Sequence, residues 1–376
     1  MRKKGHSPDF VFLSCVILIV VFGLVMLSSA SSDLGKIKFD DTYYYLKHQM
    51  SLGLTLGLIG FLLAYFVSYD FWKKLSVPLL LCSLVGLILV FTPLGFSHSD
   101  ANRWINIGSF SVQPAEFLKL TFIVYLAAWL SLRKGTDMRR QNNFLSGLLP
   151  FWIICGLIGF LIIIQPSTTT VAIILSSGLI VYFVSGARFS FIITTILVGI
   201  VGLALLIFLQ GGYRAERIET YVKNIFNQES VAKDVDKGYH INQALMAIGS
   251  GGLSGVGFGK STTKFEYLPE PIGDSIFAVI AEELGFIGAS ALLAAFIVLI
   301  FRGFLIARKT RDKFAQLTVI GIISVIAIQT FIHVGSISGI LPLTGVSLPF
   351  ISYGGTSLAV FLTMAGLVVK ISKYTS

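Results

Sequence analysis

Long apolar runs alternate with short polar segments along the whole chain. Most of the runs have about 18 residues or more, which is the length that an α-helix needs to cross a bilayer. We therefore predict an all-α polytopic membrane protein, with one domain over residues 1–376 because the helix bundle is itself the core. The ten predicted membrane-spanning helices lie at about 10–30, 49–68, 74–94, 115–132, 145–164, 168–185, 189–209, 275–301, 314–340 and 355–372.

The basic residues indicate how these helices are oriented. With residue 1 in the cytoplasm, the inner loops include the basic clusters at 2–4, 133–140 and 302–313. The short outer loops contain only Lys36, Lys38, Lys47 and Arg103. Because basic loops stay in the cytoplasm, both termini are predicted to be cytoplasmic, with one long extracytoplasmic loop at 210–274 between spans seven and eight.

Composition agrees with a membrane protein and changes the interpretation of the charge. Hydrophobic residues make up 55% of the chain and charged residues 13%, whereas soluble domains have roughly 25% charged residues. The net charge of +10 is spread over helix ends, so it indicates membrane topology and contacts with membrane lipids, and no nucleic-acid partner. Cys15, Cys82 and Cys155 lie within apolar runs, which favours a packing role over a disulfide or a metal site.

The segment 239–288 interrupts the apolar pattern. It begins as a short amphipathic helix, continues through a glycine-rich stretch, and passes into an apolar helix just after Asp274. An ionisable residue at membrane depth is costly, and so it is a candidate functional residue by default. We predict Asp274 as the chemical centre, while Glu270 is either a second acid or an ordinary surface charge. Glu282 and Glu283, two turns into the helix, are expected to face a cavity or a basic partner, or to be purely structural.

Two features of the long outer loop suggest contacts with phosphate groups. Residues 218–226 have apolar positions at helical spacing, which predicts an interfacial amphipathic helix; Arg214 and Arg217 precede it and can reach lipid phosphates. The Gly-Lys-Ser run at 259–261 resembles the end of a nucleotide-binding P-loop. Ser254 occupies the position of a required glycine and no strand precedes it, so we reject nucleotide binding. Its glycines instead permit tight turns or a close approach of backbone N–H groups to an anion.

Three further polar segments, at 102–119, 165–170 and 345–357, lie between apolar runs. Glu116 and Lys119 are three residues apart on one helical face, so they either pair with each other or line a polar cavity. The hydroxyl groups at 167–170 suggest a helix N-cap. Non-helical backbone at membrane depth is tolerated only where it is buried in protein or lines a cavity. Because these segments and 239–275 all fall at the outer ends of spans, we predict one cavity that opens to the outer leaflet.

Several motifs in these segments match a known family. They are RWI at 103–105, QPAEFLK at 113–119, YR at 213–214, YLPE at 267–270 followed by Asp274, EELG at 282–285 and LPFISYGG at 348–355. On these motifs the chain resembles the SEDS family (shape, elongation, division and sporulation), which includes RodA, FtsW and SpoVE. It is most similar to the division-type branch of FtsW and SpoVE, and next to RodA. Two departures are Ser167, where an Asp is usual, and His333, where an Asn is common.

The resemblance implies a peptidoglycan glycosyltransferase in the cytoplasmic membrane of a bacterium. Such an enzyme polymerises lipid II into glycan strands on the extracytoplasmic face and releases undecaprenyl diphosphate. Its implied partners are a class B penicillin-binding protein, which crosslinks the product, and other membrane proteins of cell division or elongation. The alternative is a flippase that transports lipid II. It is disfavoured because transporters tend to have internal repeats and polar residues at the midplane, whereas the polar residues here lie near the outer edge.

The residues expected to act on the substrate follow from this chemistry. A positioned carboxylate can serve as the general base for an attacking sugar hydroxyl, and the essential acid of the family aligns with Asp274. The departing diphosphate requires positive charge, either from side chains or from a divalent cation such as magnesium or manganese. Glu116 is expected to orient Lys119. The predicted substrate-binding residues are Lys119, Glu116, Arg103, Arg214, Arg217, Glu270 and Ser352.

Overall fold

The computed structural model describes residues 6–98, 101–107, 110–131, 142–210, 239–265 and 268–375, and helices occupy all of the predicted spans. Among these residues, eight helical segments are long and apolar enough to cross a membrane. The polytopic helical fold class is therefore confirmed, while the exact number of spans stays a prediction. The eight are α1 (Phe10–Ala30), the run of α3 (Tyr44–His48), π-helical η1 (Gln49–Leu54) and α4 (Thr55–Phe66), α5 (Tyr69–Leu89), α6 (Pro114–Ser131), the run of η3 (Phe144–Leu148) and α7 (Leu149–Ile164), α12 (Ile276–Lys309), α13 (Lys313–Ile337) and α14 (Gly355–Ser372).

Two further helices fill the remaining predicted spans. They are α8 (Thr168–Val184) and α9 (Phe189–Gln210), whose apolar stretches are shorter. Outside the membrane-spanning set lie α2 (Ser32–Phe39) and α11 (Tyr239–Ser250), and the latter is the amphipathic helix predicted at the start of segment 239–288.

The ends of the helices follow from local sequence. Asp9 precedes α1 and accepts a hydrogen bond from Phe12 N (3.0 Å), and Asp312 caps α13 in the same way through Ala315 N (2.8 Å). Pro114 stands at the first position of α6, where its missing N–H costs nothing. Side-chain caps and proline thus fix three of the boundaries that hydropathy alone places only to within a few residues.

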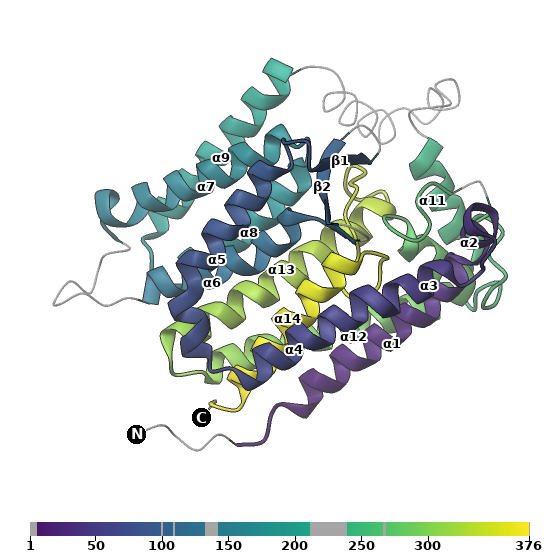
Figure 1. Ribbon diagram of the computed structural model, residues 1–376, viewed down its shortest axis with the longest axis horizontal. Coiled ribbons are helices and arrows are strands. Elements are labelled where there is room, and N and C mark those ends of the chain that lie inside the picture. Colours follow the sequence, from purple (N-terminus) through teal and green to yellow (C-terminus); the bar gives the residue numbers. More distant parts are fainter. Residues whose placement is uncertain are drawn as a thin grey trace.

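The core of the bundle is formed by α6, α13 and α14, which bury most of their residues, whereas α4 and α5 bury few of theirs. In Figure 1, α13 and α14 run through the middle of the molecule, with α5 to α9 on one side and α1, α4 and α12 on the other. Small residues allow close packing at the seam between α4 and α14. A Cβ at Gly366 would lie 2.5 Å from Phe61 O, so only glycine fits there.

A small antiparallel sheet, which hydropathy did not predict, precedes α6. Its strands are β1 (Gly95–His98), β2 (Ala101–Ile107) and β3 (Phe110–Val112), in the order β1-β2-β3. Ile105 is opposite Gly95 on one side and Val112 on the other. Strands of three to seven residues are too short to stand out between two long apolar helices. The sheet carries Arg103 on its central strand.

Candidate functional site

Asp274 lies half-buried in the turn that leads into α12. The backbone of this turn is fixed by Glu270, whose carbonyl accepts from Gly273 N and from Ser275 N (both 3.1 Å). Ser275 Oγ donates to Pro269 O (2.7 Å) and lies 2.7 Å from His240 Nε2 of α11. The carboxylate therefore sits on a hydrogen-bonded turn at a helix N-terminus, where the helix dipole favours negative charge.

The polar segment 345–353, between α13 and α14, packs directly against this turn. Ser352 Oγ donates to Gly273 O (2.8 Å) and Tyr353 N donates to Ile272 O (2.9 Å), so the two residues before Asp274 are held by this segment. A Cβ added at the exposed Gly345 would lie 3.0 Å from Asp274 Oδ2. The predicted meeting of segments 239–275 and 345–357 is therefore present in the structure.

Tyr353 joins the first outer loop to the same place. Burial raises the pKa of its phenol, so the hydroxyl stays protonated at neutral pH; it lies 2.8 Å from His48 Nδ1. Its ring meets the ring of Tyr45 edge-on, with 5.2 Å between the centroids. Gln49 Oε1 accepts from Gly354 N (3.1 Å), and this contact fixes the backbone after Tyr353. The start of the second span thus supports the segment beside Asp274.

Glu116 and Lys119 form an ion pair, which is one of the two arrangements expected from their spacing, and the pair is buried inside the bundle. Lys119 Nζ donates to Glu116 Oε1 (2.6 Å), and the two side chains are only 2% and 8% exposed. Lys119 also donates to Gln329 Oε1 of α13 (2.8 Å). Gln329 Nε2 in turn donates to Ser347 O (2.8 Å). One chain of hydrogen bonds therefore runs from α6 through α13 to the segment beside Asp274.

Gln329 and its neighbour His333 were not among the predicted site residues. His333, one helical turn after Gln329, is completely buried, and its Nδ1 donates to Val346 O (2.6 Å). This bond assigns the proton of the neutral ring to Nδ1, since a carbonyl only accepts. The signal that could have revealed both residues is a pair of large polar side chains four apart, and so on one face, in the second half of a largely apolar helix.

Arg103 connects the other two polar segments. Its Nε donates to Gln165 O (3.1 Å) and its Nη2 to Pro166 O (2.6 Å), so the sheet is attached to the turn between α7 and α8. The N-cap predicted in this turn is wrong. Ser167 occupies the position before α8 but makes no capping bond, because its hydroxyl donates instead to Thr170 Oγ1 (2.7 Å).

The glycine-rich stretch folds around two buried carboxylates of α12. Glu282 accepts from Ser261 Oγ (2.6 Å), from Thr262 N (3.0 Å) and from the hydroxyl of Thr263. Lys264 Nζ donates to Glu283 Oε1 (2.9 Å), which confirms the predicted basic partner. The run at 259–264 resembles the end of a P-loop because it also encloses an anion. That anion is the carboxylate of Glu282, a side chain of the protein itself.

The remaining predicted residues have other positions. Glu270 is exposed and supports the turn through its carbonyl, while the Ser352 hydroxyl also accepts from Leu348 N (2.7 Å); their roles in substrate binding stay predictions. Arg214, Arg217 and the amphipathic helix at 218–226 lie outside the described residues. In the part of the chain that the structure describes, no group of three His, Cys, Asp or Glu side chains could hold a metal ion, and the magnesium or manganese ion also stays a prediction.

The fold and the site together define a polytopic helical membrane protein with a polar site at one end of its bundle. Residues 9–376 match the family model of FtsW, RodA and SpoVE, which is described as cell cycle protein. The chain belongs to this family, as its motifs predicted.

Individual relatives and solved structures agree over nearly the full length. The chain is 36% identical to stage V sporulation protein E of Bacillus subtilis (strain 168) over 376 residues, with all of both chains covered. It is 34% identical to the probable peptidoglycan glycosyltransferase FtsW of Geobacter sp. (strain M18), covering 99% of this chain and 98% of the relative. None of these names favours the flippase alternative.

Two structures show the same fold. A chain from a peptidoglycan synthase complex that coordinates polymerization and crosslinking has a TM-score of 0.77 and 26% identity, covering 98% of this chain and 99% of that one. RodA of Thermus thermophilus has a TM-score of 0.70 and 27% identity, with 98% of each chain covered.

Proposed function

We propose that this protein is a peptidoglycan glycosyltransferase that polymerises lipid II. The observation that carries the proposal is Asp274, a half-buried carboxylate on a fixed turn beneath the exposed Gly345, in a chain 34% identical to a relative named for this activity. A membrane protein that only recruited partners would gain nothing from an acid in this position, since ionisable residues at membrane depth are costly.

In the proposed reaction, the C4 hydroxyl of an acceptor GlcNAc attacks the anomeric carbon of a donor MurNAc. The new bond joins this oxygen to the anomeric carbon, and the bond from that carbon to undecaprenyl diphosphate breaks. Asp274 takes the proton of the hydroxyl as the new bond forms. The leaving diphosphate carries away the electron pair of the broken bond, so positive charge beside it lowers the barrier.

The cations divide into two groups in this proposal. Lys119 is nearly inaccessible and its charge is balanced by Glu116, so it stabilises the frame around the site. Arg103 and the Arg214 and Arg217 side chains of the long loop are the candidates for contact with the diphosphate. No step uses a metal ion.

The same proposal places the site on the extracytoplasmic face of the cytoplasmic membrane. It includes a class B penicillin-binding protein as the partner that crosslinks the product, together with other membrane proteins of division or elongation. The likeness to a chain of a peptidoglycan synthase complex supports such a partner.

The experiment that tests the proposal is polymerisation of labelled lipid II by the purified protein with its class B partner. Asp274→Asn keeps the shape of the side chain and removes its charge, and we expect glycan strands from the wild type and none from this variant. Asp40→Asn is the matched control, because Asp40 is an exposed acid of the first outer loop and is not among the predicted site residues, and we expect this variant to retain most of the activity. Equal product from wild type and Asp274→Asn would exclude Asp274 as the base. Transport of lipid II across vesicle membranes without polymerisation would contradict the enzyme itself.

A further inference from the structure

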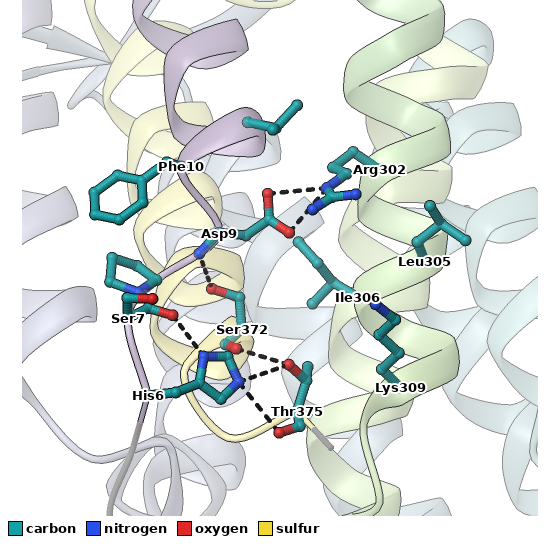
Figure 2. Close-up of a pocket in the computed structure, with 12 residues that line it drawn as sticks. His6, Ser7, Asp9, Phe10, Arg302, Leu305, Ile306, Lys309, Ser372 and Thr375 are labelled. Carbon is teal, nitrogen blue, oxygen red and sulfur yellow. Dashed lines mark hydrogen bonds and ion pairs between the residues drawn. The ribbon is translucent and has the colours of Figure 1, made fainter.

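A polar cavity lies at the far end of the bundle from Asp274. It has a volume of about 360 Å³ and is formed by the start of α1, the last turns of α12 and the end of α14 (Figure 2). Asp274 precedes α12 and Lys309 ends it; from the break in α12 at Gly285 to Lys309 alone, the helix is about 36 Å long at 1.5 Å per residue. The cavity is therefore no part of the site described above.

The polar side of this cavity is built around Arg302 and Asp9 (Figure 2). Arg302 Nε donates to both carboxylate oxygens of Asp9 (3.0 and 2.9 Å). Both bonds use Nε, and the two terminal amino groups of the guanidinium make no hydrogen bond within the described part of the chain. The Arg302 side chain is 35% exposed. An arginine in this state presents a planar set of N–H donors whose geometry matches a phosphate group.

The walls of the cavity are fixed by contacts between the two ends of the chain. His6 N donates to Lys373 O (2.9 Å), and Asp9 N donates to Ser372 Oγ (3.0 Å). The His6 ring approaches Thr375 Oγ1 to within 3.0 Å at Nε2. These bonds hold the segment before α1 against the end of α14, so the cavity is a built feature of the fold.

The other side of the cavity is apolar and continues onto the surface that faces lipid. Leu305 and Ile306 of α12 line it from within, and Phe10 and Val11 of α1 line it while 62% and 47% exposed. Phe301, also on α12, is 63% exposed. A molecule that fills the cavity thus meets cations at one end and a lipid-facing apolar surface at the other.

We infer that this cavity binds the headgroup of an anionic phospholipid, with its phosphate on Arg302 and Lys309 and its acyl chains along the start of α1. Arg302 and Lys309 are seven residues apart, two turns along one face of α12, and both line the cavity. Among the residues that line the cavity, Arg302 and Lys309 are cations and Asp9 is a carboxylate, and this excess of cations in the lining favours a headgroup with net negative charge over a zwitterionic one.

The test is native mass spectrometry of the purified full chain with phosphatidylglycerol, with phosphatidylethanolamine, and with inorganic phosphate alone. We expect Arg302→Gln and Lys309→Gln each to weaken phosphatidylglycerol binding about tenfold, as the loss of one charge-assisted contact predicts. Arg308→Gln is the matched control, because Arg308 is an exposed basic residue next to Lys309 that does not line the cavity. This variant should bind phosphatidylglycerol as tightly as the wild type does.

Asp9→Asn gives a result of opposite sign that a purely structural role would not produce. Asparagine keeps the N-cap of α1 and removes the competing carboxylate, so phosphatidylglycerol should bind several-fold more tightly. Equal binding of both lipids, or variants that all match the wild type, would overturn the inference. Inorganic phosphate that binds as tightly as the lipid, with the same dependence on Arg302, would assign the cavity to free phosphate and overturn the lipid as its ligand.

Discussion

At Gly345 the backbone lies so close to Asp274 that any side chain would compete with the carboxylate. A Cβ there would meet Asp274 Oδ2 at 3.0 Å, closer than ordinary van der Waals contact. The atom that must move is the end of a short side chain, so Gly345→Ala should leave the fold intact and displace the carboxylate of Asp274, the proposed base. We expect lipid II polymerisation to fall about ten- to a hundredfold, because small errors in position have effects of this size.

Gly273→Ala is the control for this prediction, because Gly273 precedes Asp274 directly. A Cβ there would meet Glu270 Oε2 at 3.8 Å, an ordinary contact, and should leave polymerisation within about twofold of wild type. Unchanged activity in Gly345→Ala, in a protein that unfolds at the wild-type temperature, would show that the carboxylate needs no fixed position against segment 345–353.

Gln329 is the residue on which the buried hydrogen-bond chain depends. It accepts from Lys119 and donates to Ser347 O, so Gln329→Leu leaves a buried cation with one partner fewer and releases the backbone near Gly345. We expect this variant to lose about 1.5–3 kcal/mol of stability, the range for a hydrogen bond to a charged group, and to lose activity as well. Thermal unfolding in detergent and polymerisation of lipid II measure the two effects.

Thr330 provides a matched control on the same helix. It is buried, and its hydroxyl has no hydrogen-bond partner within the described residues, so Thr330→Val removes a polar group without breaking a contact. The free energy of unfolding of the Thr330→Val variant should equal or exceed that of the wild type. Gln329→Glu retains an acceptor for Lys119 but no donor for Ser347 O, and it should recover stability more than activity. A Gln329→Leu protein as stable and active as wild type would contradict the role proposed for the hydrogen bonds that link Lys119, Gln329 and Ser347.

Sequence alone found the charged residues of the site and Ser352, and missed Gln329 and His333. Asp274, Glu116 and Lys119 stand out because charges are rare in apolar runs. Gln329 and His333 leave the apolar pattern of α13 almost unchanged, and their importance depends on which backbone lies across the helix. That backbone is 13 and 18 residues away along the chain, and no local pattern brings it there.

Among the elements, α12 and the glycine-rich stretch exchange backbone hydrogen bonds. The helix is broken at Gly285, whose φ of 66° is in the left-handed region. Val256 N and Gly257 N donate to Glu282 O and Glu283 O (both 3.0 Å). Phe286 N and Ile287 N donate to Gly252 O (2.9 Å) and Leu253 O (3.1 Å). Two carbonyl groups and two N–H groups of α12 beside the break therefore find partners in the loop, as buried backbone requires.

The Lys264–Glu283 pair should anchor this arrangement. Both side chains are almost completely buried, and Ser29 Oγ of α1 also donates to Glu283 (2.6 Å). Lys264→Met leaves the carboxylate without its cation, and we expect a loss of about 3–5 kcal/mol in the free energy of unfolding. Hydrogen exchange of segment 251–265 should rise at the same time.

The double variant Lys264→Met/Glu283→Gln separates charge from packing. Removing both charges together should restore much of the stability, because an uncompensated buried charge costs more than the loss of the pair. If the double variant were as unstable as Lys264→Met, the damage would come from lost side-chain packing instead.

Hydropathy predicted the spans well and the connecting structures poorly. Each long apolar run became a helix, since lipid leaves few other ways to satisfy the backbone. The three-stranded sheet and the two-carboxylate cradle were not foreseen, because both depend on contacts between segments that are separately short and polar. The anion enclosed by the stretch that resembles a P-loop, the Glu282 carboxylate, could be identified only from the fold.

For the whole molecule, the decisive property is which end faces the cytoplasm. The basic clusters at 302–313 and the site around Asp274 lie at opposite ends of α12. If basic loops stay inside, Asp274 faces outward, where a sugar polymer must be made. The cavity around Arg302 then opens to the inner leaflet, whose anionic lipids carry the charge that its cations would bind. One orientation therefore supports both proposed sites.

Cysteine labelling in protoplasts, whose cell membrane is intact, tests this orientation. In a background with Cys15, Cys82 and Cys155 replaced by alanine, Leu253→Cys and Arg311→Cys each place one thiol at an exposed residue near opposite ends of α12. A membrane-impermeant maleimide should label Leu253→Cys in protoplasts, and Arg311→Cys only after the membrane is opened. The reverse pattern would place Asp274 in the cytoplasm, away from the growing wall, and would contradict the proposed polymerase together with the inner-leaflet lipid site.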